Sequence, residues 1–436
     1  MEHPPADSDS LVVPGSTLRM LLGLWQPRGA APSTLSRVLP CVTLASITFL
    51  ALCVALKLGA DPPEELEQIT LCGLVGSACV GYFFKAGLFV AQGGTLRHTV
   101  RLLADTRLRF CSGDSSEFIR RRYQNHSNII YYLCQMVAVP AVIGWVLCPV
   151  LSRAVTKTDK EHQEAHRQLP LPVWLPVDVY ASPTYEFLYV VQSFCSLVTS
   201  QSCLSVDSFF VHMMLMVAAE LEVLNCNLSA MEHTNSTRTE GERFFSGHER
   251  NGERLAVLDS GQVVDQHTLP KNTAHGWLHR QLLKNVLHHQ AILRTVSLLQ
   301  SAMSVSIFSL LFINMATLCS SLFVAAVLLQ RDGNIGKAMN ALFSIPGLLY
   351  ETTIFCIYAH IMTDQSERLM YSAFSCGWIN SDARFKRSLG IFMMVTVRPI
   401  VITVGKTCTL SKQMLIQVLN GAYGLLNLLY YLHSSN

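Results

Sequence analysis

The chain has 436 residues, of which 50% are hydrophobic and 14% are charged, and its formal net charge is +3. Soluble globular proteins carry about 25% charged residues, so this composition excludes an ordinary soluble protein and indicates an integral membrane protein. The small net charge argues against nucleic acid as a partner. Most of the 14 cysteines lie singly inside apolar stretches, where they act as small buried hydrophobic residues.

Long apolar stretches predict the elements, because a helix needs about 20 mainly apolar residues to cross the hydrocarbon core. After a polar N-terminal segment, seven transmembrane helices are expected at 38–57, 69–91, 129–151, 187–219, 303–329, 338–362 and 408–433. A weaker apolar patch at 389–404 contains Arg398 and Pro399 and is interpreted as a broken half-helix leading into the seventh. Lipid requires internally satisfied backbone groups, so the expected fold class is an all-α membrane protein.

Basic residues in the short connections predict the orientation. The connections 92–128 and 363–407 are rich in Lys and Arg, whereas 58–68 contains only acidic charges. We therefore expect a cytosolic N-terminus and an extracellular C-terminus, which is opposite to the orientation of a G-protein-coupled receptor.

The connections also suggest how the chain is divided. A cytosolic N-terminal segment at 1–37 precedes helices one to four at 38–225, which include an extracellular lid loop at 152–186. The prolines and aromatic residues of this loop predict an ordered structure at the membrane surface. A cytosolic polar insertion at 226–276 has a composition typical of disorder.

The second half of the chain is expected to hold helices five and six together with a cytosolic anchor region at 277–407, and helix seven at 408–436. Helices four and five continue beyond the membrane as amphipathic extensions. These extensions would either shield one another or carry contacts between subunits.

Enzyme signatures are absent from the sequence. It contains no H-E-x-x-H, G-x-S-x-G, Walker or paired C-x-x-C motif, so neither catalysis nor a cofactor is expected. His288 and His289 are adjacent on a helix and do not share a face, which argues against a metal site.

Ionisable residues inside the predicted spans are rare. Lys85 lies near a helix end and is interpreted as snorkelling to the interface. Asp207, His212 and Glu351 lie deeper, where each needs a partner or water. An interhelical hydrogen bond is favoured over a ligand contact for these three.

The last predicted helix carries polar residues on a single stripe. Their separations of 4, 3, 4, 3 and 4 residues place Gln413, Gln417, Asn420, Gly424, Asn427 and Tyr431 on one face. For an isolated chain, this stripe would by default face neighbouring helices. If several copies met around an axis, it would line a pore, and Leu428 and Leu432 beside it would form an apolar gate.

The C-terminal part resembles the signature of insect odorant receptors. Matching features in the stretch from Ser372 onward are Trp378, Lys386–Leu389, Met393, Arg398–Pro399, Gly405, Leu410–Ser411 and Tyr423. The outer-loop sequences LPVWLPVD and SPTYEFLYVVQ, and His289 with its flanking helix, also fit. The orientation predicted from charge is also that of this family.

The resemblance implies an odorant receptor subunit of a ligand-gated non-selective cation channel. Its pore is lined by the last helix, and the cytosolic extensions form a shared anchor domain. Implied partners are a small volatile organic ligand, permeant cations, membrane lipid and the odorant co-receptor (Orco) in a heterotetramer. The implied location is the plasma membrane of an olfactory sensory neuron dendrite. The tail differs from the valine-rich tail of the co-receptor, which favours an odor-tuned subunit.

Other classes of function stay open at this point. A gustatory-receptor-like channel is one alternative, although Ala422–Tyr423 replaces the Thr-Tyr of that family's motif. A metabotropic seven-helix chemoreceptor is another, and it predicts an extracellular N-terminus. A transporter is a third, but the two halves of the chain show no repeat.

The resemblance also places the ligand in the outer half of the bundle, between helices two, three, four and six. The residues that it assigns to this cavity are Cys79, Tyr82, Phe83, Ala138, Ala141, Ile143, Trp145, Tyr189, Ser193, Phe194, Phe343, Gly347 and Tyr350. An apolar and aromatic cavity with a few hydroxyl groups suits a small volatile compound. Ordinary helix packing is the alternative interpretation for each residue taken alone.

Overall fold

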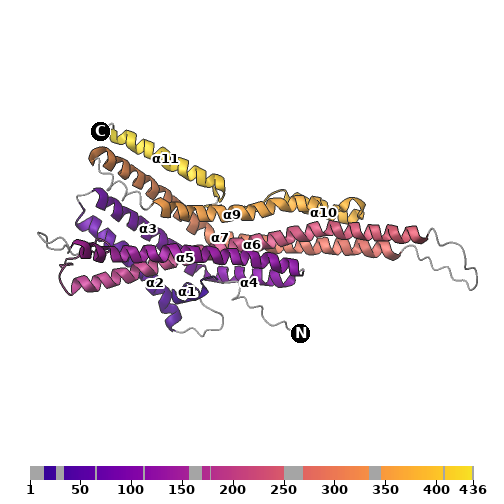
Figure 1. Cartoon of the computed structure of the whole chain (residues 1–436), viewed down its shortest axis with the longest axis horizontal. Coiled ribbons are helices and arrows are strands. Elements are labelled where there is room, and N and C mark those ends of the chain that lie inside the picture. Colours follow the sequence, from indigo (N-terminus) through magenta and orange to yellow (C-terminus); the bar gives the residue numbers. More distant parts are fainter. Residues whose placement is uncertain are drawn as a thin grey trace, which may run out of the picture.

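A computed structural model gives the arrangement of the chain, which is a bundle of long helices drawn out along one axis (Figure 1). It describes residues 14–25, 34–63, 66–110, 113–156, 169–176, 178–249, 269–332, 345–405 and 408–434. In chain order, the elements are α1 Ser16–Leu21, α2 Thr34–Ala60, α3 Leu66–Ala91, α4 Gly93–Arg109, α5 Asp114–Thr156, α6 Thr184–Glu249, α7 Leu269–Asp332, α9 Ile345–Phe374, η1 Trp378–Asn380, α10 Ala383–Thr396, β1 Thr403–Val404, β2 Cys408–Thr409 and α11 Lys412–Ser434.

The all-α class expected from the sequence is confirmed. Among the described residues, six helices are long and apolar enough to cross a membrane, namely α2, α3, α5, α6, α7 and α9. The 23-residue α11 is the seventh expected helix. It ends at the same end of the bundle at which α6 begins (Figure 1). This end is called the outer end below, following the orientation predicted from charge.

Helix α6 forms the centre of the bundle. Its residues from Val206 to Leu228 are almost all buried, and 94% of its most apolar 18-residue stretch is buried, against 6% for α5. Helices α2, α3, α5, α7 and α9 pack around it. A helix that is apolar on every side is stable when other helices cover all of its faces, and α6 follows this rule.

The polar segment 226–276 is more helical than its composition predicts. Helix α6 continues to Glu249 and α7 begins at Leu269, so both ends of the segment are helical, and 250–268 lie outside the described residues. The expectation of disorder is wrong for these ends. Extending a packed helix adds one hydrogen bond per residue and needs no new nucleation, so a polar continuation is inexpensive.

The expectation of a half-helix at 389–404 is also partly wrong. Helix α10 begins after Asp382, whose carboxylate accepts a hydrogen bond from Ala383 N at 2.7 Å, and it ends just before Arg398–Pro399. Proline disfavours a helical residue before it, so the chain leaves the helix there. A short antiparallel hairpin of β1 and β2 follows, and therefore α11 begins at Lys412 rather than at 408.

Gly405 forms the turn of this hairpin. Its φ is +60°, and a Cβ at this position would lie 2.4 Å from the ring of Phe308 on α7. Glycine is therefore required both by the backbone conformation and by the close approach to α7. The hairpin fixes the point at which α11 leaves the bundle.

The outer lid loop is ordered where it is described. Gln192 of α6 holds Leu171 by two hydrogen bonds, one from Leu171 N at 3.1 Å and one to Leu171 O at 3.2 Å. Val173 and Val179 of the loop pack with Leu188 of α6 in a small apolar cluster. These contacts pack the described part of the loop against the first turns of α6.

Candidate functional site

A cluster of charged side chains lies buried between the transmembrane helices. Lys85 of α3 is 2% exposed, and its Nζ lies 2.5 Å from Asp207 Oδ1 and 2.7 Å from Glu351 Oε1. The same ammonium donates to Cys203 Sγ at 3.1 Å, and Asn314 of α7 donates to Glu351 Oε2 at 3.2 Å. The cluster joins α3, α6, α7 and α9 at a single point.

Lys85 therefore does not snorkel to the interface, and that interpretation is wrong. Its position near a helix end suggested an exit to water, but the carboxylates of Asp207 on α6 and Glu351 on α9 lie within 2.7 Å of its ammonium. A buried charge is stable only when it is paired and hydrogen-bonded, and this one is both. For Asp207 and Glu351, the expectation of an interhelical partner agrees with these contacts.

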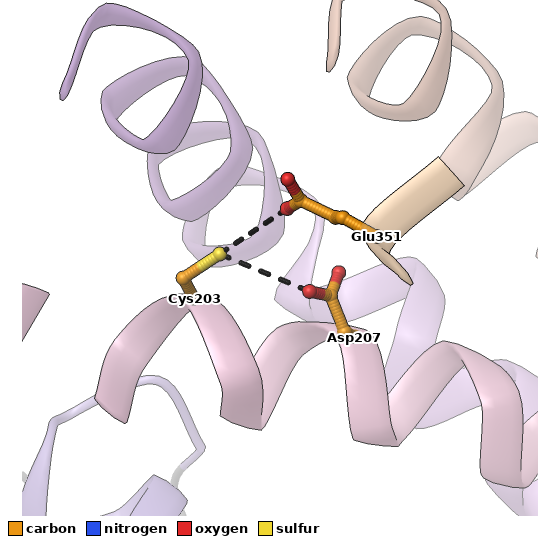
Figure 2. A group of neighbouring side chains, drawn as sticks. All are labelled: Cys203, Asp207 and Glu351. Carbon is orange, nitrogen blue, oxygen red and sulfur yellow. Dashed lines mark hydrogen bonds between the residues drawn. The ribbon is translucent and has the colours of Figure 1, made fainter. Parts of the chain in front are cut away.

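The same cluster resembles a metal site at first sight. The ligand atoms of Cys203, Asp207 and Glu351 all lie within 4.8 Å of one another. Figure 2 shows Cys203 and Asp207 reaching from α6 toward Glu351 of α9. However, the Lys85 ammonium lies 2.5–3.1 Å from an atom of each of them, which is where a cation would sit. The geometry therefore favours an ammonium-centred ion cluster over a metal centre.

The sequence did not single out Cys203 or Asn314 as members of this cluster. One usable signal was present, because one basic and two acidic residues in separate apolar helices complement each other in charge. Whether Cys203 and Asn314 face the cluster depends on how α6 and α7 are rotated about their axes. The sequence alone does not determine this rotation.

Several of the predicted cavity residues surround this cluster. Tyr82 lies one turn from Lys85 on α3, and the Lys85 Nζ is 5.9 Å from the centre of its ring. Tyr350 precedes Glu351 on α9, and its hydroxyl contacts the Cys134 thiol of α5. Elements that are far apart in sequence thus bring aromatic rings and thiols beside the ion cluster.

The other predicted cavity residues differ from one another in exposure and in contacts. Cys79 is buried in the main core, while Phe83 is 41% exposed and Tyr350 is 46% exposed. On α6, the Ser193 hydroxyl donates to Tyr189 O at 2.7 Å, and the Tyr189 hydroxyl bonds Val146 O of α5. The remaining residues of the set are exposed or half-buried where described, namely Ala138, Ala141, Ile143, Trp145, Phe194 and Gly347, and Phe343 lies outside the described residues.

The polar stripe of α11 faces away from the rest of the chain. Its members Gln413, Gln417, Asn420, Gly424, Asn427 and Tyr431 are all exposed. On the opposite face, Ala422 is 1% exposed, and Gly421 packs near Met315 of α7. Within the part of the chain that the structure describes, the stripe is thus exposed and the buried side of α11 lies elsewhere on the helix. The side chains of Leu428 and Leu432 lie outside the described residues.

A second buried ion cluster joins the extensions of α6 and α7, which are called cytosolic here following the orientation predicted from charge. Glu220 of α6 is 0% exposed and accepts two hydrogen bonds from Arg120, at 2.9 and 2.8 Å. Arg107 Nε donates to the same carboxylate at 3.0 Å, and His288 Nε2 lies 3.2 Å from it. Burial lowers the pKa of Arg107, and the nearby Glu220 carboxylate opposes this change. The extensions shield one another here.

His289 occupies a different environment from its neighbour His288. Its ring packs edge-on against Phe392 of α10, with the ring centres 5.4 Å apart. The two histidines thus lie on different faces of α7, which agrees with the argument against a shared metal site.

Comparison with known proteins places this fold in a family. The profile described as 7tm Odorant receptor matches residues 71–423. Odorant receptor Or1 of Anopheles gambiae is 21% identical over 425 residues, which cover 95% of this chain and 93% of that receptor. Putative odorant receptor 19b of Drosophila melanogaster is 28% identical over 149 residues, and this match spans 34% of this chain and 38% of that receptor.

A solved structure has the same fold. The insect olfactory receptor OR5 from Machilis hrabei, in complex with eugenol, aligns with a TM-score of 0.72 at 14% sequence identity. The alignment covers 98% of this chain and 97% of that receptor. Both the profile, over most of the chain, and the fold, over nearly all of it, lead to one assignment. The chain is a membrane protein that belongs to the insect 7tm odorant receptor family, which comprises receptors and not enzymes.

Proposed function

We propose that this receptor is an odor-tuned subunit of a ligand-gated, non-selective cation channel in the plasma membrane of an olfactory neuron dendrite. It would assemble with the co-receptor Orco in a heterotetramer and bind a small volatile compound in the outer half of its helix bundle. Ligand binding would favour an open state in which the last helices move apart and the apolar constriction fills with water.

The exposed stripe of α11 is the observation that carries this proposal. Amide side chains such as Asn420 and Asn427 are costly in lipid, yet no helix of this chain covers them in the part that the structure describes. The apolar face of α11 is already used against α7, where Gly421 meets Met315. Water in a pore shared with other subunits, or the helices of those subunits, would satisfy the stripe.

The ligand cavity follows from the same arrangement. Tyr82 of α3 lies beside Lys85 of the ion cluster, and Tyr350, which precedes Glu351 on α9, contacts Cys134 of α5. They mark the inner limit of a cavity that would extend outward past Ser193 and Tyr189 of α6. Rings and hydroxyl groups in an apolar setting suit the recognition of a small organic molecule.

Recording from cells that produce this chain together with the co-receptor tests the proposal. A broad panel of volatile compounds should evoke inward currents with channel-like unitary events. Cells producing the co-receptor alone are the control, and they should give no response to the same compounds. Absence of any odor-evoked current, with both proteins present at the surface, would rule the proposal out.

The gate has its own test. Leu428→Ser and Leu432→Ser would replace the apolar constriction with hydroxyl groups, so the basal current without odorant should rise several-fold, because a polar ring no longer dewets. Met414→Ser, on the face of α11 that packs on the chain itself, is the matched control and should leave the basal current unchanged. An unaltered basal current in both leucine variants would place the gate elsewhere.

A further inference from the structure

The buried cluster described above has an imbalance of charge. One ammonium, from Lys85, faces the two carboxylates of Asp207 and Glu351, while the Cys203 thiol is neutral. With both carboxylates ionised, the cluster would hold one uncompensated negative charge within the membrane. Such a charge is costly to bury, so the cluster needs one further positive charge, supplied either by a proton on a carboxyl group or by a second cation.

The helices around the cluster do not supply a second cation. The titratable groups that face it are Tyr82 and Lys85 from α3, Cys134 from α5, Cys203 and Asp207 from α6, and Tyr350 and Glu351 from α9. Helix α7 contributes Asn314, which does not titrate. Among the described residues, Lys85 is thus the only basic side chain that contacts these carboxylates.

Buried hydroxyl groups without a partner lie on the outer side of the cluster. Thr199 is 5% exposed, and its Oγ1 has no hydrogen bond within the part of the chain that the structure describes. It lies one turn outward of Cys203 and two turns outward of Asp207, on the same face of α6. A buried hydroxyl group without a partner, on the helix face that leads to an ion cluster, indicates a position that can bind a further polar group.

A polar line on α7 leads to the same place. Asn314, Thr317 and Ser321 share one face of this helix, and Thr317 Oγ1 lies 3.1 Å from Ser77 Oγ of α3. Ser321, the outermost of them, is 1% exposed, and its hydroxyl also lacks a partner among the described residues. A line of hydroxyl groups, rather than apolar side chains alone, therefore extends from the outer end of the bundle toward the cluster.

Aromatic rings around the cluster also favour a cation. The Lys85 nitrogen lies 5.9 Å from the ring centre of Tyr82 and 6.0 Å from that of Phe355. The face of an aromatic ring attracts ammonium groups, most strongly when they are desolvated. A second ammonium bound near these rings would benefit from the same attraction.

We propose that the Lys85–Asp207–Glu351 cluster recognises the basic nitrogen of a volatile amine, an inference that rests on the proposed odorant-binding function. The amine enters the cavity as its neutral base. Its nitrogen takes the proton held by the carboxyl group, so an N–H bond forms as the O–H bond breaks. The product is an ammonium–carboxylate pair beside Lys85, with two positive and two negative charges, and no net charge enters the membrane.

Other ligand classes fit this arrangement less well. A carboxylic acid would add a third acidic group beside two that already outnumber the single ammonium. A metal ion would have to displace Lys85, whose nitrogen is within 2.5–3.1 Å of all three potential ligands. An alcohol or an ester carries no positive charge, so it would leave two carboxyl groups opposite a single ammonium.

A matched pair of compounds tests the proposal. n-Hexylamine and 1-hexanol have the same chain length and differ in the basic nitrogen. In cells producing this chain with the co-receptor, the concentration of n-hexylamine that gives a half-maximal current should be at least tenfold lower than that of 1-hexanol. Equal potency of the two compounds would overturn the proposal.

Two variants locate the effect in the cluster. Asp207→Asn and Glu351→Gln each leave one carboxylate opposite Lys85, so the empty cluster stays neutral and the receptor should fold. The bound ammonium then lacks a counter-charge, and the half-maximal concentration of n-hexylamine should rise at least tenfold, while that of any active neutral odorant changes by less than about threefold. Asp364→Asn, a carboxylate on α9 paired with His360 and far along the helix, is the control.

Calorimetry of n-hexylamine binding to the purified complex separates this inference from the channel proposal. Carboxylate-dependent binding without any current would support amine recognition and contradict the channel. Currents from neutral odorants, together with no calorimetric binding of n-hexylamine, would overturn amine recognition alone. Retention of full amine affinity in both carboxylate variants would also overturn it.

Discussion

Two regions of this receptor contain polar side chains within predicted transmembrane helices. In one region these side chains are buried, and in the other they are exposed. On α6, Asp207 is buried, and its charge is met by Lys85 of α3 at 2.5 Å. On α11, Asn420 and Asn427 are exposed, and the neighbouring helices of the same chain pack on the other face. The buried residues have their partners within the same chain, whereas the exposed amides would find theirs in water or in other subunits of the proposed assembly.

This difference separates the polar residues that stabilise the single chain from those that would act only in the proposed assembly. Removing the single ammonium of the buried Lys85 cluster leaves negative charge without compensation, so it should affect folding of the single chain. Changing an exposed amide removes nothing that the isolated subunit uses. The following substitutions test this division, beginning with the largest expected effect.

Lys85→Met should be the most damaging substitution, because it leaves Asp207 and Glu351 facing each other without a cation. Breaking a buried ion cluster in this way costs about 3–5 kcal/mol, so thermal unfolding of the purified receptor should occur at a markedly lower temperature. Lys57→Met is the control, since its pair with Asp61 is partly exposed and should contribute less than about 1 kcal/mol. Equal effects of the two variants would contradict the role given to the buried cluster.

Glu220→Gln should destabilise the cytosolic extensions, with a cost of about 2–4 kcal/mol, because it removes the carboxylate shared by Arg107 and Arg120. Hydrogen exchange of α4 and of the cytosolic part of α7 should increase. Glu117→Gln, whose pair with Arg121 is exposed, is the matched control and should leave the exchange unchanged. Unaltered protection in the Glu220 variant would show that the cluster is dispensable for folding.

Asn427→Leu should have the smallest effect on folding and the clearest effect on the current. The side chain is exposed in the subunit, so the unfolding temperature should stay within the experimental error. If the stripe lines the pore, unitary conductance should fall, because an amide that solvates passing ions is lost. Leu419→Ile, exposed but about 80° around the helix from Asn427, should change neither quantity. A lower unfolding temperature for Asn427→Leu in the isolated subunit would break the comparison between the two regions.

The sequence predicts the helices well, because their apolar stretches are long and uninterrupted. It predicts less well where they stop. Arg398–Pro399 marks the end of a helix, yet the hairpin that follows depends on Gly405 approaching Phe308, which lies far away in sequence. Contacts of this kind exist only after α7 has taken its place.

The partners of the charged residues were the hardest part of the site to predict. The position of Lys85 near a helix end was compatible with water, and only the rotation of α3 toward α6 and α9 decides in favour of burial. The spacing of Asn420 and Asn427 did predict a common face on α11, because helical periodicity is local. In the proposed assembly the neighbours of that face come from other subunits, which local helical periodicity does not encode.

The continuity of α6 has a mechanical consequence. This helix runs unbroken over 66 residues from Thr184 to Glu249, which corresponds to about 100 Å at 1.5 Å per residue. Asp207 and Glu220 lie on the same rod, about 20 Å apart. If the proposed ligand binds beside Lys85, a tilt of α6 by about 3° about Asp207 would displace Glu220 by about 1 Å, so binding at one cluster would mechanically shift the other.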